Sequence, residues 1–142
     1  MDRAQERLAK KIFDIRLRGA ELYFLPVETR VPLKFGKETL TSVTCARVRV
    51  IVEDQQGRLA SGWGETPLSV QWVWPSDVGY AFRHEALKDF CEQLTAAWAS
   101  FNVSGHPIEI GYDFQQQVLP DLLGGFNRDC KPQERMPTLA AL

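Results

Sequence analysis

The stretch from Ser42 to Glu65, SVTCARVRVIVEDQQGRLASGWGE, decides the fold. Its first half alternates in the period of two that is typical of a β-strand with two different faces. One face carries Thr44, Ala46, Val48, Val50 and Val52, and the other carries Cys45, Arg47, Arg49 and Ile51. A turn follows at residues 54–57, where Gly57 is free to take a positive φ, and residues 58–65 return as a second strand. So short a turn predicts an antiparallel pair.

The residues before this hairpin predict a further strand and a loop. Phe13, Ile15 and Leu17 alternate with polar neighbours, so an extended chain is expected from Ile12. A bulge is expected at Gly19-Ala20, after which the strand continues to Leu25. Because proline cannot donate to a β-ladder, Pro26 and Pro32 bracket a predicted loop that runs to about Thr41. Residues 2–11 have the spacing of a short polar helix or arm.

The residues after the hairpin predict helices. Apolar side chains recur at steps of three and four over residues 81–100, which indicates an amphipathic helix. A second helix is predicted over residues 112–123, kinked or split at Pro120 and ended by Gly124-Gly125. Residues 137–142 resemble the first turn of another helix, and we interpret the chain as truncated there. Strands followed by helices predict an α+β fold, a three-stranded antiparallel sheet followed by a helical bundle.

Composition is that of one ordinary globular domain. The chain has 142 residues, of which 44% are hydrophobic and 25% charged. A formal net charge of -1 argues against nucleic acid or a membrane surface as a partner. Residues 1–58 hold 12 of the 17 Lys and Arg, an excess that long side-chain stems covering a sheet face would explain. Three cysteines at wide spacing offer no disulfide framework, and a cytoplasmic location is expected.

Catalytic groups are few. His84 and His106 are far apart in the sequence and form no zinc-binding pair, so each is expected to be an ordinary surface histidine. The glycines near Gly62 match neither a phosphate-binding loop nor a nucleophile elbow. Gly62-Trp63-Gly64-Glu65 is, by itself, a glycine-rich strand end in which Trp63 would anchor on the sheet. We predict no catalytic residue and no metal ligand in this chain.

In its context, however, this motif resembles one end of a known domain. A loop with Pro32-Leu33-Lys34-Phe35-Gly36 precedes the strand at residues 45–52, and a Gly57 turn, Gly62-Trp63-Gly64-Glu65 and helices follow. The arrangement is similar to the N-terminal capping domain of the enolase superfamily, in its mandelate racemase and muconate lactonizing enzyme branch. The resemblance covers residues 12–142, with a sheet over 12–65 and helices over about 81–142, and leaves residues 1–11 as a polar arm.

The resemblance implies a function for the parent protein. In that family the domain closes the mouth of a barrel, where a Lys or His base removes the proton beside a substrate carboxylate and Mg²⁺ stabilises the enediolate. The barrel is absent from these 142 residues, so the chain alone is expected to be inactive and to bind no Mg²⁺. The parent would be a racemase, cycloisomerase or acid-sugar dehydratase that acts on a small carboxylate.

The resemblance also implies the site residues, because two loops of the family's domain shape the substrate pocket. They correspond here to residues 26–37 and 66–74. The expected substrate-binding residues are Arg30, Pro32, Lys34, Phe35, Trp72 and Trp74. The tryptophans and Phe35 would exclude water, and Arg30 or Lys34 would meet the carboxylate.

An alternative from another class stays open at this point. The chain could be a stand-alone module that binds a carbohydrate or peptide on exposed Trp72, Trp74 and Tyr80, because tryptophan and tyrosine suit such surfaces. Whether the reading frame continues beyond Leu142 would discriminate between the two hypotheses. A lid without its barrel would expose apolar surface, with homo-oligomerisation as one consequence.

Overall fold

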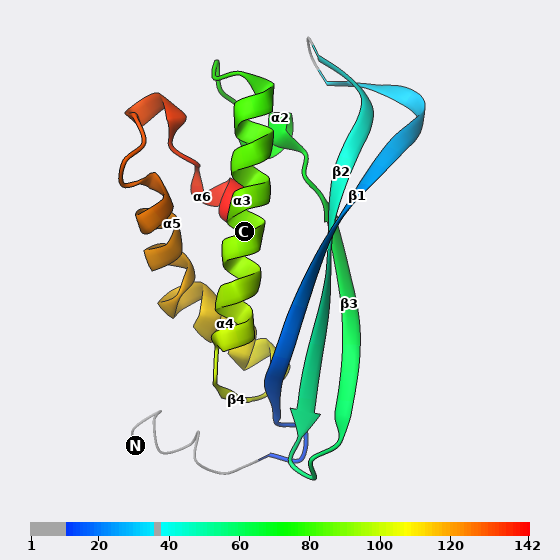
Figure 1. Ribbon diagram of the computed structural model, residues 1–142, viewed down its shortest axis with the longest axis vertical. Helices are drawn as coiled ribbons and strands as arrows, with labels where there is room; N and C mark the ends of the chain where they lie inside the picture. The colour runs from blue at the N-terminus through cyan, green and yellow to red at the C-terminus, as the bar shows by residue number, and fades with distance from the viewer. Residues whose placement is uncertain (1–10, 36–37) are drawn as a thin grey trace.

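The computed structural model describes residues 11–35 and 38–142, with the backbone alone at positions 35 and 38. The helix predicted over residues 2–11 lies outside the described chain, apart from Lys11. The molecule has two layers, a sheet and a set of helices that lie against one face of it (Figure 1). The predicted α+β class is confirmed.

The sheet has four antiparallel strands in the order β3-β2-β1-β4 (Figure 1). The long strands are β1 (Ile15–Phe35), β2 (Glu38–Asp54) and β3 (Leu59–Pro67). The fourth strand, β4 (Ser104–Gly105), was not predicted, because its two residues pair with the start of β1 and carry no periodicity of their own. The turn between β2 and β3 is as predicted, with Gly57 at a φ of 79°.

β1 departs from the prediction beyond Leu25. A register shift between Leu17 and Gly19 places a bulge at Arg18, directly before the predicted position at Gly19-Ala20. The predicted loop at Pro26 is wrong, since β1 and β2 continue together as a long two-stranded arm. Pro26 pairs with Thr44, and within the described chain β4 covers the other edge of β1 only near Ile15. An edge strand tolerates proline because the missing donor faces away from the ladder. Pro32 lies in a second irregularity, between Glu28 and Leu33.

The helices are partly as predicted. They are α2 (Val70–Val73), α3 (Tyr80–Ser100), α4 (Pro107–Gln117), α5 (Leu119–Asn127), the 3₁₀ helix η1 (Pro132–Glu134) and α6 (Thr138–Ala141). The predicted second helix begins earlier because His106 and Glu109 form a capping box at the start of α4. The split near Pro120 is confirmed, since α4 ends at Gln117 and α5 begins at Leu119. Gly124-Gly125 do not end α5, which continues to Asn127.

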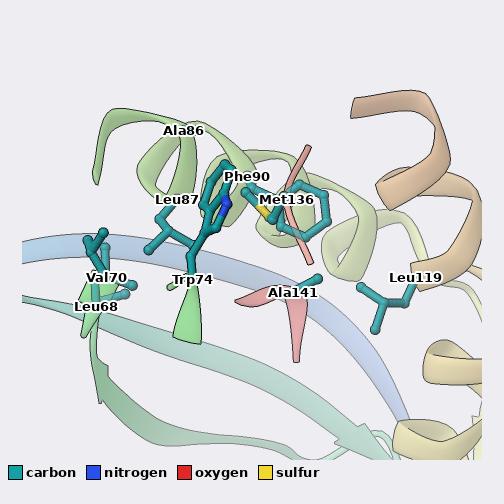
Figure 2. Packing of buried hydrophobic residues seen from close by; sticks show 10 residues of the cluster. Leu68, Val70, Trp74, Ala86, Leu87, Phe90, Leu119, Met136 and Ala141 are labelled. Carbon is teal, nitrogen blue, oxygen red and sulfur yellow. The ribbon is translucent and has the colours of Figure 1, made fainter. Parts of the chain in front are cut away.

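The core lies where the helices meet β1 and β2. α3 packs mainly on β1, and the core gathers side chains from β2, the β3–α2 connection, α2, α3, α5 and α6 (Figure 2). Its buried members are Ala46, Leu68, Val70, Trp74, Ala86, Leu87, Phe90, Leu119, Met136 and Ala141. The Asn127 side chain bonds both the backbone N–H and the carbonyl of Met136, at 2.8 and 2.9 Å, and so ties the last segment to α5.

A second cluster of aromatic rings joins α3 to α4. The ring of Trp98 stacks on that of Phe114 at 3.9 Å and 10° between planes. Phe101 meets both rings edge-on, at 5.9 and 5.3 Å. Such stacked and edge-on pairs add to the apolar burial that holds two helices together. In the part of the chain that the structure describes, no helix has the length and apolar character that crossing a membrane requires.

Candidate functional site

The two predicted lid segments leave the sheet at the same rung, at Thr44. Pro26, the first residue of one segment, pairs with Thr44 of β2. On the other side of β2, the backbone N–H of Leu68 donates to the Thr44 carbonyl at 2.8 Å. The arm formed by β1 and β2 and the short helix α2 therefore lie at one end of the molecule (Figure 1). We call this end the arm end.

The first segment is the arm itself, a strand rather than the predicted loop. Arg30, Pro32 and Lys34 are all exposed on it, and Lys34 pairs with Thr39 in the register. The side chain of Phe35 lies outside the described residues. The Oγ1 of Thr29 donates to the Thr41 carbonyl at 3.1 Å and ties the arm across its irregularity. The structure thus presents Arg30 and Lys34 to solvent at the arm end.

In the second segment, residues 66–74, one of the two tryptophans lies as predicted and the other does not. Trp72 is 71% exposed, as expected, but Trp74 is only 2% exposed. One turn of helix at α2 directs the two rings to opposite sides, so Trp74 enters the core, where it lies toward α3 (Figure 2). There its ring meets Phe82 edge-on at 6.5 Å, and its carbonyl accepts a bond from Nη1 of Arg83. Trp74 is a core residue and not a substrate contact.

The burial of Trp74 also affects the binding-module hypothesis. That hypothesis needs Trp72, Trp74 and Tyr80 on one open face. Tyr80 is exposed but stacks on the His84 ring at 5.7 Å and 11°. Of the three rings, therefore, only that of Trp72 is both exposed and without an aromatic contact among the described residues.

His84 was expected to be an ordinary surface histidine, and the structure gives it a different place. It is half-buried, and its Nε2 lies 2.9 Å from the Oγ1 of Thr44. Its Nδ1 lies 3.4 Å from the Glu85 carboxylate. His84 therefore joins α3 to the rung from which both lid segments start. Sequence reasoning missed this role because Thr44 and His84 are 40 residues apart and no local pattern relates them.

The outer face of the sheet, opposite the helices, carries Arg47 and Arg49 of the basic residues. Arg47 pairs with Glu65 at 2.5 Å, and Arg49 pairs with Glu21 at 3.4 Å. Arg49 also lies over the Trp63 ring, 6.0 Å from its centroid. Trp63 lies on this face of the sheet, where its ring meets that of Tyr23 at 5.8 Å, and it stays 60% exposed. Exposed ion pairs of this kind contribute little stability, so the face is best understood as a solvated surface with long side-chain stems.

An apolar groove of about 580 Å³ opens between the inner face of the sheet and α3. We call it the sheet groove. Its walls include Val48, Val50 and Val52 of β2, and Cys91, Leu94 and Trp98 of α3. Among the lining residues in the described part of the chain, the only charged one is Glu65. The volume lies in the range of ligand sites, although such sites usually add a few convergent polar groups.

Comparisons with known proteins add no assignment, because no family model, no curated protein and no solved structure matches the chain. Within residues 11–35 and 38–142, no group of three or more His, Cys, Asp or Glu side chains is placed to hold a metal ion.

Cys91 in the sheet groove gives a testable pH dependence. Burial raises the pKa of its thiol to about 11, and the nearby Glu92 carboxylate adds to the rise. At pH 8 the thiolate fraction is then roughly 0.1%, against about a quarter for an ordinary thiol. Iodoacetamide should therefore alkylate Cys91 on the order of a hundredfold more slowly in the folded protein than in urea, as followed by peptide mass spectrometry.

The same shift has a consequence for stability. The unfolded chain loses the thiol proton from about pH 9, whereas the folded protein holds it to about pH 11, so unfolding becomes easier as the pH rises through this window. Below pH 9 the contribution of Cys91 is fully present. A Cys91→Ala variant should lose this part of the pH dependence in urea titrations. Equal alkylation rates in folded and unfolded protein would contradict the burial of the thiol.

Proposed function

We propose that this domain is the substrate-capping domain of a Mg²⁺-dependent enzyme of the enolase-superfamily type, and that it supplies pocket walls rather than catalytic groups. The observation that carries the proposal is the common rung at Thr44. The arm begins at Pro26, on the β1 side of Thr44, and the connection to α2 passes Leu68, on its β3 side. Two segments that are far apart in the sequence therefore leave the sheet at the same place. A lid needs this kind of convergence, because both segments must reach the same substrate.

The exposed side chains at the arm end suit a lid over an acid. Arg30 and Lys34 offer cations to a carboxylate, and the exposed indole of Trp72 offers a large apolar surface that excludes water. Mg²⁺ prefers carboxylate and carbonyl oxygens, so these three side chains are not its ligands. In this proposal the metal and the base that removes the α-proton belong to a barrel, and this domain contributes binding and orientation. The substrate is a small carboxylate.

Proton exchange tests this division of labour. The protein carrying this domain, affinity-purified from its source with Mg²⁺ and any barrel polypeptide attached, is incubated in D₂O with a panel of 2-hydroxy acids and sugar acids. Proton NMR follows loss of the α-proton signal. We expect exchange by the barrel-containing protein and none by the isolated 142 residues. Exchange by the isolated chain, or a source protein that contains no barrel, would overturn the proposal.

Trp72→Ala tests the lid role within the active protein. Removing the exposed indole should raise KM about tenfold and change kcat less, because the loss is in binding and positioning. Trp63→Ala is the matched control, since Trp63 is similarly exposed but lies on the outer face of the sheet. Equal kinetic effects of the two substitutions would contradict a specific role for the arm end.

A further inference from the structure

β3 is an edge strand that lacks the usual protection against pairing. All nine of its residues are exposed, and in the described chain it pairs with β2 alone. Natural proteins block such edges with lysine, proline, bulges or a covering element. β3 has no lysine, and its one charged residue, Glu65, is paired with Arg47 of β2. Its only proline is the last residue, Pro67, and its register with β2 is unbroken. Its free backbone groups are therefore available to another strand.

Within residues 11–35 and 38–142, the inner face beside this edge is uncovered. Ala60, Gly62 and Gly64 pair with Val52, Val50 and Val48, so they lie on the face that borders the sheet groove. These valines are only half-buried although they belong to a central strand, because α3 packs on β1 and hardly reaches β2. A Cβ atom built on Gly62 or Gly64 meets nothing within 4 Å. Strand glycines often admit a close neighbour, and here that place is open.

We propose that the edge of β3 binds an extended segment of a partner polypeptide, which adds a fifth strand to the sheet. Its backbone bonds the free groups of β3, and its alternate side chains, large and apolar, lie over Gly62 and Gly64 and fill the sheet groove. This is strand addition, in which the backbone gives affinity and alternate side chains give specificity. Large side chains beside strand glycines compensate for the missing Cβ atoms. The inference does not depend on the proposed capping function.

Charge indicates the chemistry of the occupant. Of the described residues that line the sheet groove, Glu65 is the only charged one, and its carboxylate is already paired with Arg47. A charged side chain of the partner would lose its water there without gaining an opposite charge, at a cost of several kcal/mol. The groove-facing positions of the partner are therefore neutral and apolar. Polar residues fit the alternate positions, which face solvent on the side of Trp63.

The amount of surface argues against a second copy of this chain. Two nine-residue β3 strands paired edge to edge meet along only about 30 Å, a single strand-to-strand contact. A stable dimer needs about 1,200 Å² of buried surface or more. A second β3 would also offer only Ala60, Gly62 and Gly64 to the inner face, which would leave the groove unfilled. A partner segment with valine or phenylalanine at those positions covers both the edge and the groove.

A designed peptide tests the proposal on the full chain. The probe is a fluorescein-labelled nine-residue peptide that alternates threonine with valine and phenylalanine. Its binding is followed by fluorescence anisotropy, and amide hydrogen exchange of β3 is measured by NMR. We expect saturable binding. We also expect slower exchange of those β3 amides that point away from β2, along the open edge of the sheet. A peptide of the same sequence, N-methylated along the edge that faces β3, should bind at least about tenfold more weakly, because it cannot form the ladder.

Two variants of β3 test whether the peptide lies over the inner face of the strand or over its outer face. A Cβ atom at Gly62 has open space around it, so Gly62→Val puts a branched side chain where the peptide would lie and should weaken its binding about tenfold or more. Ser61→Val is the matched control on the outer face, and we expect its affinity to stay within about twofold of the unmodified chain. Circular dichroism verifies that both variants are folded.

Several results would overturn the inference. These are absence of binding, equal binding of the N-methylated peptide, and a Gly62→Val variant that binds as well as the Ser61→Val variant. Sedimentation that shows a dimer of the unmodified chain, dispersed by Gly62→Val, would assign the edge to a second copy instead. Displacement of the peptide by decanoate together with unchanged β3 exchange would assign the groove to a small apolar ligand.

Discussion

Replacing Trp74 with alanine is expected to lower the free energy of unfolding by about 3–5 kcal/mol. The indole is 2% exposed and belongs to the core that α2 and α3 share with the sheet. Removing it deletes apolar burial and leaves a cavity that the surrounding helices fill only in part. Since small domains are stable by only about 5–15 kcal/mol, the variant should be largely unfolded in moderate urea. Urea denaturation followed by far-UV circular dichroism measures the loss.

Trp72→Ala is the control for this prediction. The same residue type stands two positions earlier in the same turn of helix, but its ring is 71% exposed. We expect the control to change stability by no more than about 0.5 kcal/mol. Similar losses for the two variants would mean that the rings do not lie on opposite sides of α2.

The second large effect is expected at Phe114, which lies outside the main core. Phe114→Ala removes the ring that stacks on Trp98 and meets Phe101 edge-on, and should also cost about 3–5 kcal/mol. Tyr112→Ala is the control on the same helix, because Tyr112 is 59% exposed whereas Phe114 is 2% exposed. Urea denaturation gives the two losses, and an equal cost for both would contradict the ring cluster.

Hydrogen exchange distinguishes the two large effects. Phe114→Ala should speed amide exchange in α4 and β4 first, because the ring cluster holds α4 against α3. Trp74→Ala should instead affect α2 and the first turns of α3. As the two residues belong to separate clusters, we expect the losses of the double variant to add within about 0.5 kcal/mol.

Local patterns predicted the elements whose causes are local. The alternation over residues 42–53, the positive φ at Gly57 and the apolar stripe of α3 each depend on residues a few positions apart. These features gave the strands, the hairpin and the long helix. The split near Pro120 followed in the same way from a proline that cannot continue a helix.

The remaining features depend on distant partners. Pro26 was expected to end β1, yet the strand continues because most of that edge of β1 carries no neighbour in the described chain, which no nearby residue reveals. Trp74 was expected to face the substrate, but the turn of helix at α2 places its ring in the core instead. The bond between His84 and Thr44 spans 40 residues. For the candidate site, sequence therefore supplied the segments, while the fold decided which of their side chains are available.

The order of strands before helices has a consequence for synthesis. A ribosome that makes this chain completes β1, β2 and β3 before the first turn of α3 exists. During that interval the inner face of the hairpin is without its helical cover, and both edges of the nascent sheet are open. The chain is then most exposed to aggregation, and a slow stretch of translation between Pro67 and Tyr80 would prolong the risk. When α3 emerges it covers the β1 side, whereas the β3 side stays exposed to other nascent chains.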